Sequence, residues 1–156
     1  MGRRIGFLGL AFKPGTDDLR NAPALEIAAE LGRLGARVRG FDPVINEVPE
    51  PPGTSLEIAD SVAEAALGAE ALVLLTEWPE FSEIDPAELR RLVRVPLVLD
   101  GRNFLHAERW RAAGFSYAGV GRGGVSLDED GMAAPNGPVG PVWVGDAVDS
   151  VGAVAE

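Results

Sequence analysis

The loop at residues 9–20, GLAFKPGTDDLR, contains Lys13, the only lysine of a chain whose thirteen other Lys/Arg positions are arginine. A lysine ammonium is a compact charge on a flexible stem, whereas an arginine guanidinium is a rigid fork. Keeping lysine here therefore favours a site that needs one reaching ammonium, for a phosphate or a substrate oxygen. The alternative interpretation is a solvated loop lysine.

Two arginines could share this anion chemistry. Arg20 precedes a predicted helix, whose unpaired amides also favour negative charge. The alternative is a surface ion pair with Asp17 or Asp18, worth only about 0–1 kcal/mol if exposed. Arg102 follows Asp100 and a glycine, so its guanidinium could grip a diphosphate or sugar with two parallel bonds. An arginine held by Asp100 is the alternative that remains open.

Other residues near predicted strand ends have weaker claims. Asp42 has the position of the acidic residue that binds ribose in dinucleotide folds, but the first loop lacks G-x-G-x-x-G, so Asp42 could simply end a strand. Trp78 and Phe81 could stack on a base or pack in the core. His106, the sole histidine, has no Cys, His or carboxylate partners at ligand spacing, and we expect no metal site. No G-x-S-x-G motif supports a serine nucleophile.

These residues need elements to position them, and the hydrophobic pattern predicts strands alternating with helices. Strands are predicted at 3–9, 36–42, 69–78, 95–102 and 115–121, and helices at 21–35, 59–68, 85–94 and 106–114. The pattern indicates an α/β fold with a doubly wound, mostly parallel five- to six-stranded sheet and helices on both faces.

The first helix is predicted from its punctuation. Asn21 is a candidate cap, proline lies in the first turn and Gly35 follows the end. Four residues recur at helical spacing and are expected to face the sheet: Leu25, Ala28, Leu31 and Leu34.

Polar and charged residues follow most of the predicted strands. They lie at 11–13, at 42, at 76–78 and at 100–103. Ligands of open parallel sheets bind beyond the carboxyl ends of the strands. We therefore expect one ligand-binding edge.

Composition predicts one compact domain at residues 1–122 and an appended Gly/Pro/acidic tail at 123–156, in which VWVGDAV could add a strand. The net charge of −10 argues against nucleic-acid binding. With no signal-peptide pattern and no apolar run near 20 residues, we expect no membrane association and a cytoplasmic protein.

Five segments together resemble a known family: GLAFKPGTDDLRNAPALEIAAEL, GFDPV, LVLLTEWPEF, VLDGRN and AAGFSYAGVGR. In this order and spacing, from Ile5 to Arg122, they resemble the carboxy-terminal UDP-binding domain of the UDP-glucose/GDP-mannose dehydrogenases, whose fold is Rossmann-like. FKPGTDDLR together with TEWPEF is specific, and TEWPEF is closer to the UDP-glucose branch. The family's serine before Pro23 is Ala22 here, which removes one helix-capping hydroxyl.

The resemblance implies oxidation of the C6 alcohol of UDP-glucose to a carboxylate, in two NAD-dependent steps, by a larger enzyme. It implies that Phe12, Lys13 and Arg102 contact the UDP-sugar and that Arg20 lies toward the NAD. It also implies an amino-terminal NAD-binding domain, a central dimerisation region and a homodimer or higher assembly.

The catalytic cysteine of that family has no counterpart here, because the chain contains no cysteine. We therefore expect no catalytic residue in this chain and no activity from it alone. Two alternatives stay open. One is a free-standing nucleotide- or anion-binding regulatory module, and the other is an interaction domain whose tail recruits a partner.

Overall fold

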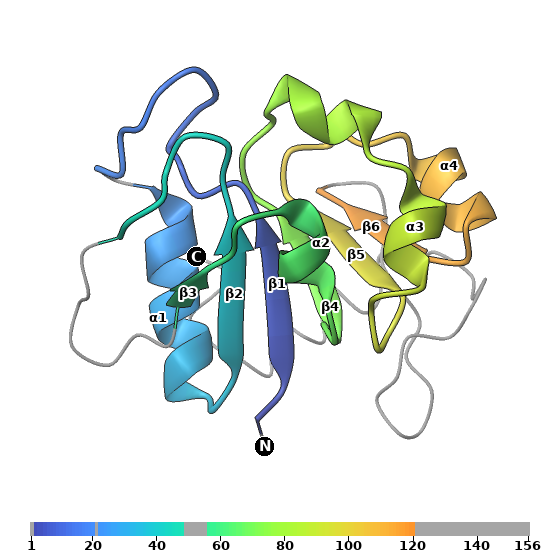
Figure 1. The fold of residues 1–156 in the computed structure, drawn as a ribbon, viewed down its shortest axis with the longest axis horizontal. Helices are drawn as coiled ribbons and strands as arrows, with labels where there is room; N and C mark the ends of the chain where they lie inside the picture. The colour runs from blue at the N-terminus through green and yellow to red at the C-terminus, as the bar shows by residue number, and fades with distance from the viewer. Residues whose placement is uncertain (1, 21, 49–55, 121–156) are drawn as a thin grey trace.

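Six parallel strands form one sheet in the computed structural model, which describes residues 2–20, 22–48 and 56–120 (Figure 1). The strands are β1 (Arg4–Leu8), β2 (Arg37–Phe41), β3 (Leu56–Ile58), β4 (Ala71–Leu74), β5 (Leu97–Asp100) and β6 (Ser116–Gly119). The helices are α1 (Pro23–Arg33), α2 (Val62–Ala66), α3 (Pro86–Arg90) and α4 (Ala107–Ala112), with a 3₁₀ turn η1 (Pro79–Glu83). The predicted doubly wound α/β fold is confirmed.

The strand order β3-β2-β1-β4-β5-β6 reverses direction between β1 and β4. The chain runs outward from β1 through β2 to β3, then returns to place β4 on the other side of β1. Because all neighbouring strands pair in parallel, their carboxyl ends meet at one edge. Ligand sites of this architecture lie at that edge, beside the reversal.

The sixth strand is β3, a segment that the hydrophobic pattern did not predict. It has only three residues, too few to show an alternation, and it pairs with β2 from Val38 to Gly40. The alternative strand in VWVGDAV and the whole predicted tail at 123–156 lie outside the described residues, so the boundary at 122 stays a prediction.

Helices cover both faces of the sheet. Figure 1 shows α2 and α3 in front of it, and the right-handed crossover from β1 to β2 places α1 on the opposite face, against β2 and β3. Contact between β1 and α2 is close, because a Cβ on Gly6 would lie 2.5 Å from the carbonyl oxygen of Ala65. Any larger residue at position 6 would push α2 off the sheet.

The amino end of α1 has no side-chain cap. Its N-cap residue is Ala22, which forms no side-chain hydrogen bond, and proline occupies the first turn. The missing capping hydroxyl inferred from Ala22 is therefore confirmed. Asn21, the predicted cap, lies outside the described residues.

The predicted inner face of α1 is only partly right. Ala28 is fully buried and Leu31 packs against the core, but Leu34 is 73% exposed. The reason is that α1 ends at Arg33, so Leu34 follows the last helical residue and leaves the apolar stripe. Ala24 takes a buried place instead.

The remaining helices are confirmed with shorter bounds, since α2 and α3 have five residues each and α4 has six. Asp85 begins α3 by accepting a hydrogen bond from the Ala87 amide at 3.0 Å, whereas His106 begins α4 without a side-chain bond. None of the helices among the described residues has the length and apolar character needed to cross a membrane.

Candidate functional site

The Asp42 carboxylate ties together three loops at the carboxyl edge of the sheet. It is 5% exposed and lies directly after β2. One oxygen, Oδ2, accepts hydrogen bonds from the amides of Leu10 and Ala11 at 2.8 and 3.0 Å and from the Trp78 indole at 3.1 Å. Oδ1 accepts the amides of Val44 and Ile45 at 2.9 and 3.1 Å.

This arrangement corrects the ribose-binding interpretation of Asp42. Both oxygens already accept bonds from the protein, and the group is buried, so a sugar hydroxyl has no oxygen left to meet. A carboxylate that accepts five N–H donors holds these donors in place. Asp42 is a structural anchor for the loops that follow β1, β2 and β4.

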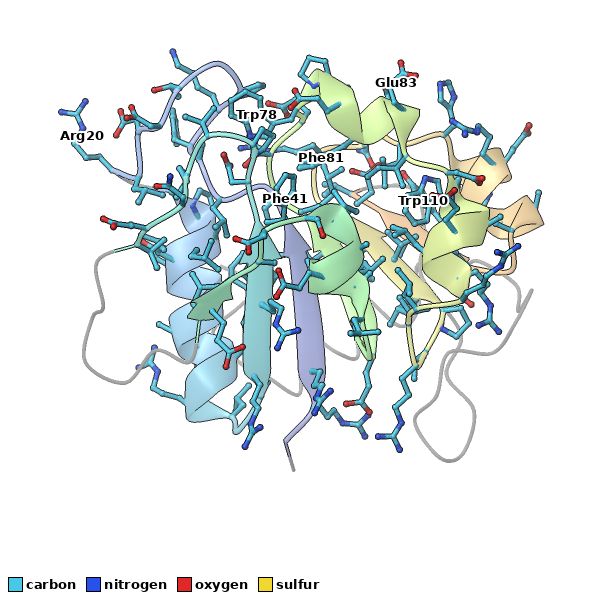
Figure 2. The ribbon with its side chains drawn as sticks, viewed as in Figure 1. Arg20, Phe41, Trp78, Phe81, Glu83 and Trp110 are labelled. Atoms are coloured by element: carbon cyan, nitrogen blue, oxygen red, sulfur yellow. The ribbon has the colours of Figure 1, made fainter. Side chains whose placement is uncertain are left out.

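Trp78 and Phe81 belong to the core, as one of their two interpretations predicts. They are 6% and 1% exposed. Figure 2 shows Phe81 beside Phe41, whose ring meets that of Phe81 edge-on at a centroid separation of 6.3 Å. With so little ring surface accessible, neither can stack on a nucleotide base.

The start of the Lys13 loop is fixed against the end of β4. Thr76 is fully buried, and its hydroxyl donates to the carbonyl of Ala11 at 2.7 Å. Gly9 has a φ of +91°, and a Cβ there would lie 2.5 Å from the Cβ of Thr76. Only glycine allows the chain to pass Thr76 at this point. The position of Phe12 therefore depends on two elements far apart in sequence.

Arg102 connects the loop after β5 with the loops after β4 and β1. Its Nε donates to the carbonyl of Leu75 at 3.0 Å, and one terminal nitrogen, Nη2, donates to the carbonyl of Phe12 at 3.3 Å. Glu77 lies 3.5 Å from Nε and forms an ion pair that is about one-third exposed on each side. The guanidinium is thus fixed at the edge while part of it stays accessible.

The alternative in which Asp100 holds the Arg102 guanidinium is wrong. Asp100 is 2% exposed and accepts the backbone amide of Arg102 at 3.1 Å. Its other oxygen accepts the Leu105 amide and the Tyr117 hydroxyl, each at 2.7 Å. Asp100 therefore shapes the turn, and the guanidinium pairs with Glu77, one of the predicted strand-end residues at 76–78 that had no role assigned from the sequence. Its place at the end of β4, next to β5, was the available signal.

Phe12 and Lys13 have exposed side chains on the loop that Arg102 contacts through the Phe12 carbonyl. The ring of Phe12 is 44% exposed, and its amide donates to the Asp18 carbonyl at 3.0 Å, which closes the loop. Lys13 is exposed, and within the part of the chain that the structure describes its ammonium forms no hydrogen bond or ion pair. Since the Phe12 carbonyl that Arg102 binds belongs to the peptide bond with Lys13, the backbone of Lys13 lies next to the Arg102 guanidinium.

Arg20 forms the surface ion pair that was one of its two interpretations. Its Nε and Nη2 donate to the two oxygens of Asp18 at 3.0 and 3.1 Å, and its backbone amide donates at 2.9 Å. These bonds lower the pKa of the Asp18 carboxyl, with a smaller contribution from the charge of Lys13. The Arg20 side chain is 88% exposed and extends away from the sheet in Figure 2.

Metal ligation finds no support in the described ranges, where no three His, Asp or Glu side chains gather in the way a metal ion requires. The loops after β1 and β5 carry an exposed ammonium, a partly exposed guanidinium and an exposed ring, groups that can recognise an anion.

An all-parallel sheet in this strand order defines a Rossmann-like domain. The chain belongs to the UDP-glucose/GDP-mannose dehydrogenase family, and residues 6–107 match the UDP binding domain of that family.

Relatives with assigned activities support this assignment. The chain is 46% identical over 127 residues to the UDP-glucose 6-dehydrogenase of Pseudomonas aeruginosa PAO1, covering 78% of this chain and 28% of that protein. It is 42% identical over 125 residues to the UDP-glucose 6-dehydrogenase TuaD of Bacillus subtilis strain 168, covering 80% and 27%. The chain therefore spans little more than a quarter of the length of these relatives.

A solved structure of a dehydrogenase has a similar fold. An NDP-N-acetyl-D-galactosaminuronic acid dehydrogenase from Methanosarcina mazei Go1 superposes with a TM-score of 0.69 at 29% identity, over 78% of this chain and 25% of that one.

Proposed function

We propose that this chain is the part of an NAD-dependent UDP-glucose 6-dehydrogenase that binds the nucleotide sugar. The complete enzyme would oxidise UDP-glucose to UDP-glucuronate. The observation that carries the proposal is the bond from Arg102 to the Phe12 carbonyl. It brings the three residues implicated by the family resemblance, Phe12, Lys13 and Arg102, to one edge of the sheet.

In this proposal each of the three residues has a separate task. Lys13 extends its ammonium to the diphosphate or a sugar oxygen, which suits a flexible point charge. Arg102 keeps its contacts with the Leu75 and Phe12 carbonyls and offers its accessible surface to the same ligand. Phe12 covers an apolar part of the ligand with its exposed ring. Glu77 neutralises Arg102 until an anionic ligand arrives.

The NAD-facing role is assigned to Arg20. Two of its three nitrogens bond Asp18, and the third has no hydrogen bond among the described residues. One phosphate oxygen of a dinucleotide could meet that nitrogen. NAD, when bound, supplies the hydride acceptor, and a separate domain of the enzyme would hold most of it.

Oxidation itself is assigned to residues outside this chain. The family resemblance implies a cysteine nucleophile, and the chain contains none. We therefore expect this chain to bind UDP-glucose without converting it, in a dimeric or larger assembly whose other domains supply the thiol and the cofactor.

Calorimetric titration of the chain with UDP and with UDP-glucose tests the proposal. Lys13→Ala should weaken binding of either ligand at least about tenfold, the effect of losing one charge-assisted bond. Arg33→Ala is the matched control, since Arg33 is an exposed arginine at the far end of α1 that pairs with Glu30. Equal affinity of Lys13→Ala and the unmodified chain would remove Lys13 from the site.

The reading frame upstream of Met1 distinguishes this proposal from a free-standing binding module. A continuous frame encoding a glycine-rich nucleotide-binding fold and a cysteine-bearing helix would support the dehydrogenase. A stop codon immediately upstream would support the module.

A further inference from the structure

Three arginines line one face of the sheet near the amino ends of β1 and β2, opposite the edge described above. Arg4 and Arg37 are register partners in the parallel pair of these strands, so their side chains stand next to each other on the same face. Arg39 follows two positions later on that face and is the register partner of Gly6. Since Gly6 faces Ala65 of α2, all three arginines lie on the α2 side.

The side chains border a hollow beside the carboxyl end of α2. It has a volume of about 60 Å³, and its lining includes Arg4, Arg37, Arg39, Glu57, Ala65 and Leu67. Figure 1 shows that α2 lies over the arrowhead half of β1 and leaves the lower halves of β1 and β2 uncrossed by a helix on this side. Arg4 and Arg37 are exposed, so within the described residues their side chains at the hollow reach solvent.

Only one of the three guanidiniums has acceptors in the described structure. Arg39 bonds the Glu57 carboxylate at 3.2 Å and the Glu64 carbonyl at 3.4 Å. The guanidiniums of Arg4 and Arg37 form no hydrogen bond or ion pair within residues 2–20, 22–48 and 56–120. The carboxylate of Glu70 accepts the Arg4 amide and pairs with the side chain of Arg3.

This arrangement is unfavourable without a counter-ion. Like charges directly opposite on neighbouring strands destabilise a sheet. The clustering also stands out because the chain as a whole carries a net charge of −10. A bound anion would convert the repulsion between Arg4 and Arg37 into two attractive contacts.

We propose that Arg4 and Arg37 form a second anion site, which takes a compact phosphate group and is separate from the nucleotide-sugar edge. Guanidinium forks match the oxygens of phosphate geometrically. About 10–15 Å³ suffices for one water molecule, so 60 Å³ has room for a tetrahedral anion. Ala65 and Leu67 close one side of the hollow, which favours a small ligand over an extended acidic peptide.

Nuclear magnetic resonance with inorganic phosphate tests the site on the full chain at low ionic strength. Phosphate should cause saturable shifts of the amides at Arg4 and at residues 37–39. Arg37→Gln should weaken this binding at least about tenfold, and Arg33→Gln should leave it unchanged. Pyrophosphate as a second probe distinguishes a site for free phosphate from a site for the phosphates of a larger molecule. Only a site of the second kind should bind pyrophosphate more tightly than inorganic phosphate.

A thermal measurement without phosphate supplies an independent readout. Arg37→Gln should raise the midpoint of unfolding at low salt because it removes one of two neighbouring like charges, and Arg4→Gln should do the same. Shifts that never saturate, or equal phosphate affinity in Arg37→Gln and the unmodified chain, would overturn the site. A lowered midpoint of unfolding in both variants would contradict the finding that the guanidiniums of Arg4 and Arg37 have no acceptor among the described residues. Binding of UDP-glucose should be unaffected by either substitution, so this proposal and the proposed function fail separately.

Discussion

Arg102 donates a hydrogen bond of 3.3 Å to the carbonyl of Phe12, across ninety positions of sequence. The contact joins the loop after β5 to the loop after β1, on the two sides of the strand β4 that separates them. A planar guanidinium makes this possible, because one nitrogen reaches Phe12 while another reaches Leu75. Arg102 therefore connects the loops after β1, β4 and β5.

Arg102→Lys should weaken both stability and ligand binding. A lysine ammonium cannot reproduce the fork that meets the carbonyls of Leu75 and Phe12, so we expect a loss of about 1–2 kcal/mol in the free energy of unfolding. Urea denaturation measures this loss, and calorimetry should show weaker UDP-glucose binding. Arg91→Lys, on the exposed end of α3, is the control. Equal effects of the two substitutions would contradict the bridging role of Arg102.

Asp42→Asn should be severely destabilising despite its similar size. In the variant, the NH₂ of the asparagine must face N–H donors that bond a carboxylate oxygen in the unmodified chain, such as the Leu10 amide and the Trp78 indole. We expect a loss of roughly 3 kcal/mol, because buried donors lose a charged acceptor. Denaturant unfolding followed by tryptophan fluorescence measures it. Asp60→Asn, at an exposed position, should change stability little, and a similarly small change for Asp42→Asn would exclude the anchoring role.

Two glycine substitutions separate backbone strain from steric exclusion. Gly9 and Gly15 both have positive φ values, +91° and +81°, but only Gly9 faces a neighbour, Thr76, within 4 Å. Gly15→Ala should cost about 1 kcal/mol from the backbone alone. Gly9→Ala should cost roughly 3 kcal/mol, since overpacking adds to it. Chemical denaturation of both variants provides the comparison, and equal losses would mean that the loop can move away from Thr76.

The Asp18–Arg20 pair predicts a pH effect confined to the Lys13 loop. Arg20 lowers the pKa of Asp18 below its ordinary value. The pairing therefore stabilises the loop above the ordinary pKa of an aspartate, and this contribution is lost as the pH falls through the lowered value. Carboxyl carbon resonances should show a lowered pKa for Asp18 and a return toward the ordinary value in Arg20→Gln. Arg33→Gln should leave the Asp18 titration unchanged, and a shift there would indicate a general charge effect.

The sequence predicted the alternation of strands and helices well, because strands such as β1 and β4 are buried apolar runs between turn residues. It also predicted that Phe12, Lys13 and Arg102 share an edge, since parallel strands collect their carboxyl ends there. The short strand β3 escaped detection because three residues carry no period. Leu34 was misplaced because an apolar stripe does not reveal where a helix stops.

The partners of buried carboxylates were the other part that local pattern could not supply. Asp42 sits at a strand end, as a ribose ligand would, and only the folded chain brings the Trp78 indole to it. Likewise, Asp100 accepts the backbone amide of Arg102, whereas Glu77 pairs with the Arg102 guanidinium. The donor that each carboxylate contacts depends on which groups the fold brings next to it, and proximity in sequence does not determine this.

The most direct test of the proposed nucleotide-sugar edge is a titration of the isotope-labelled chain with UDP-glucose, followed by amide resonances. We expect saturable shifts that are largest at Phe12, Lys13 and Arg102 and are lost or strongly weakened in Lys13→Ala. Largest shifts at the opposite ends of the strands, around Arg4 and Arg37, or shifts that persist unchanged in Lys13→Ala, would contradict it.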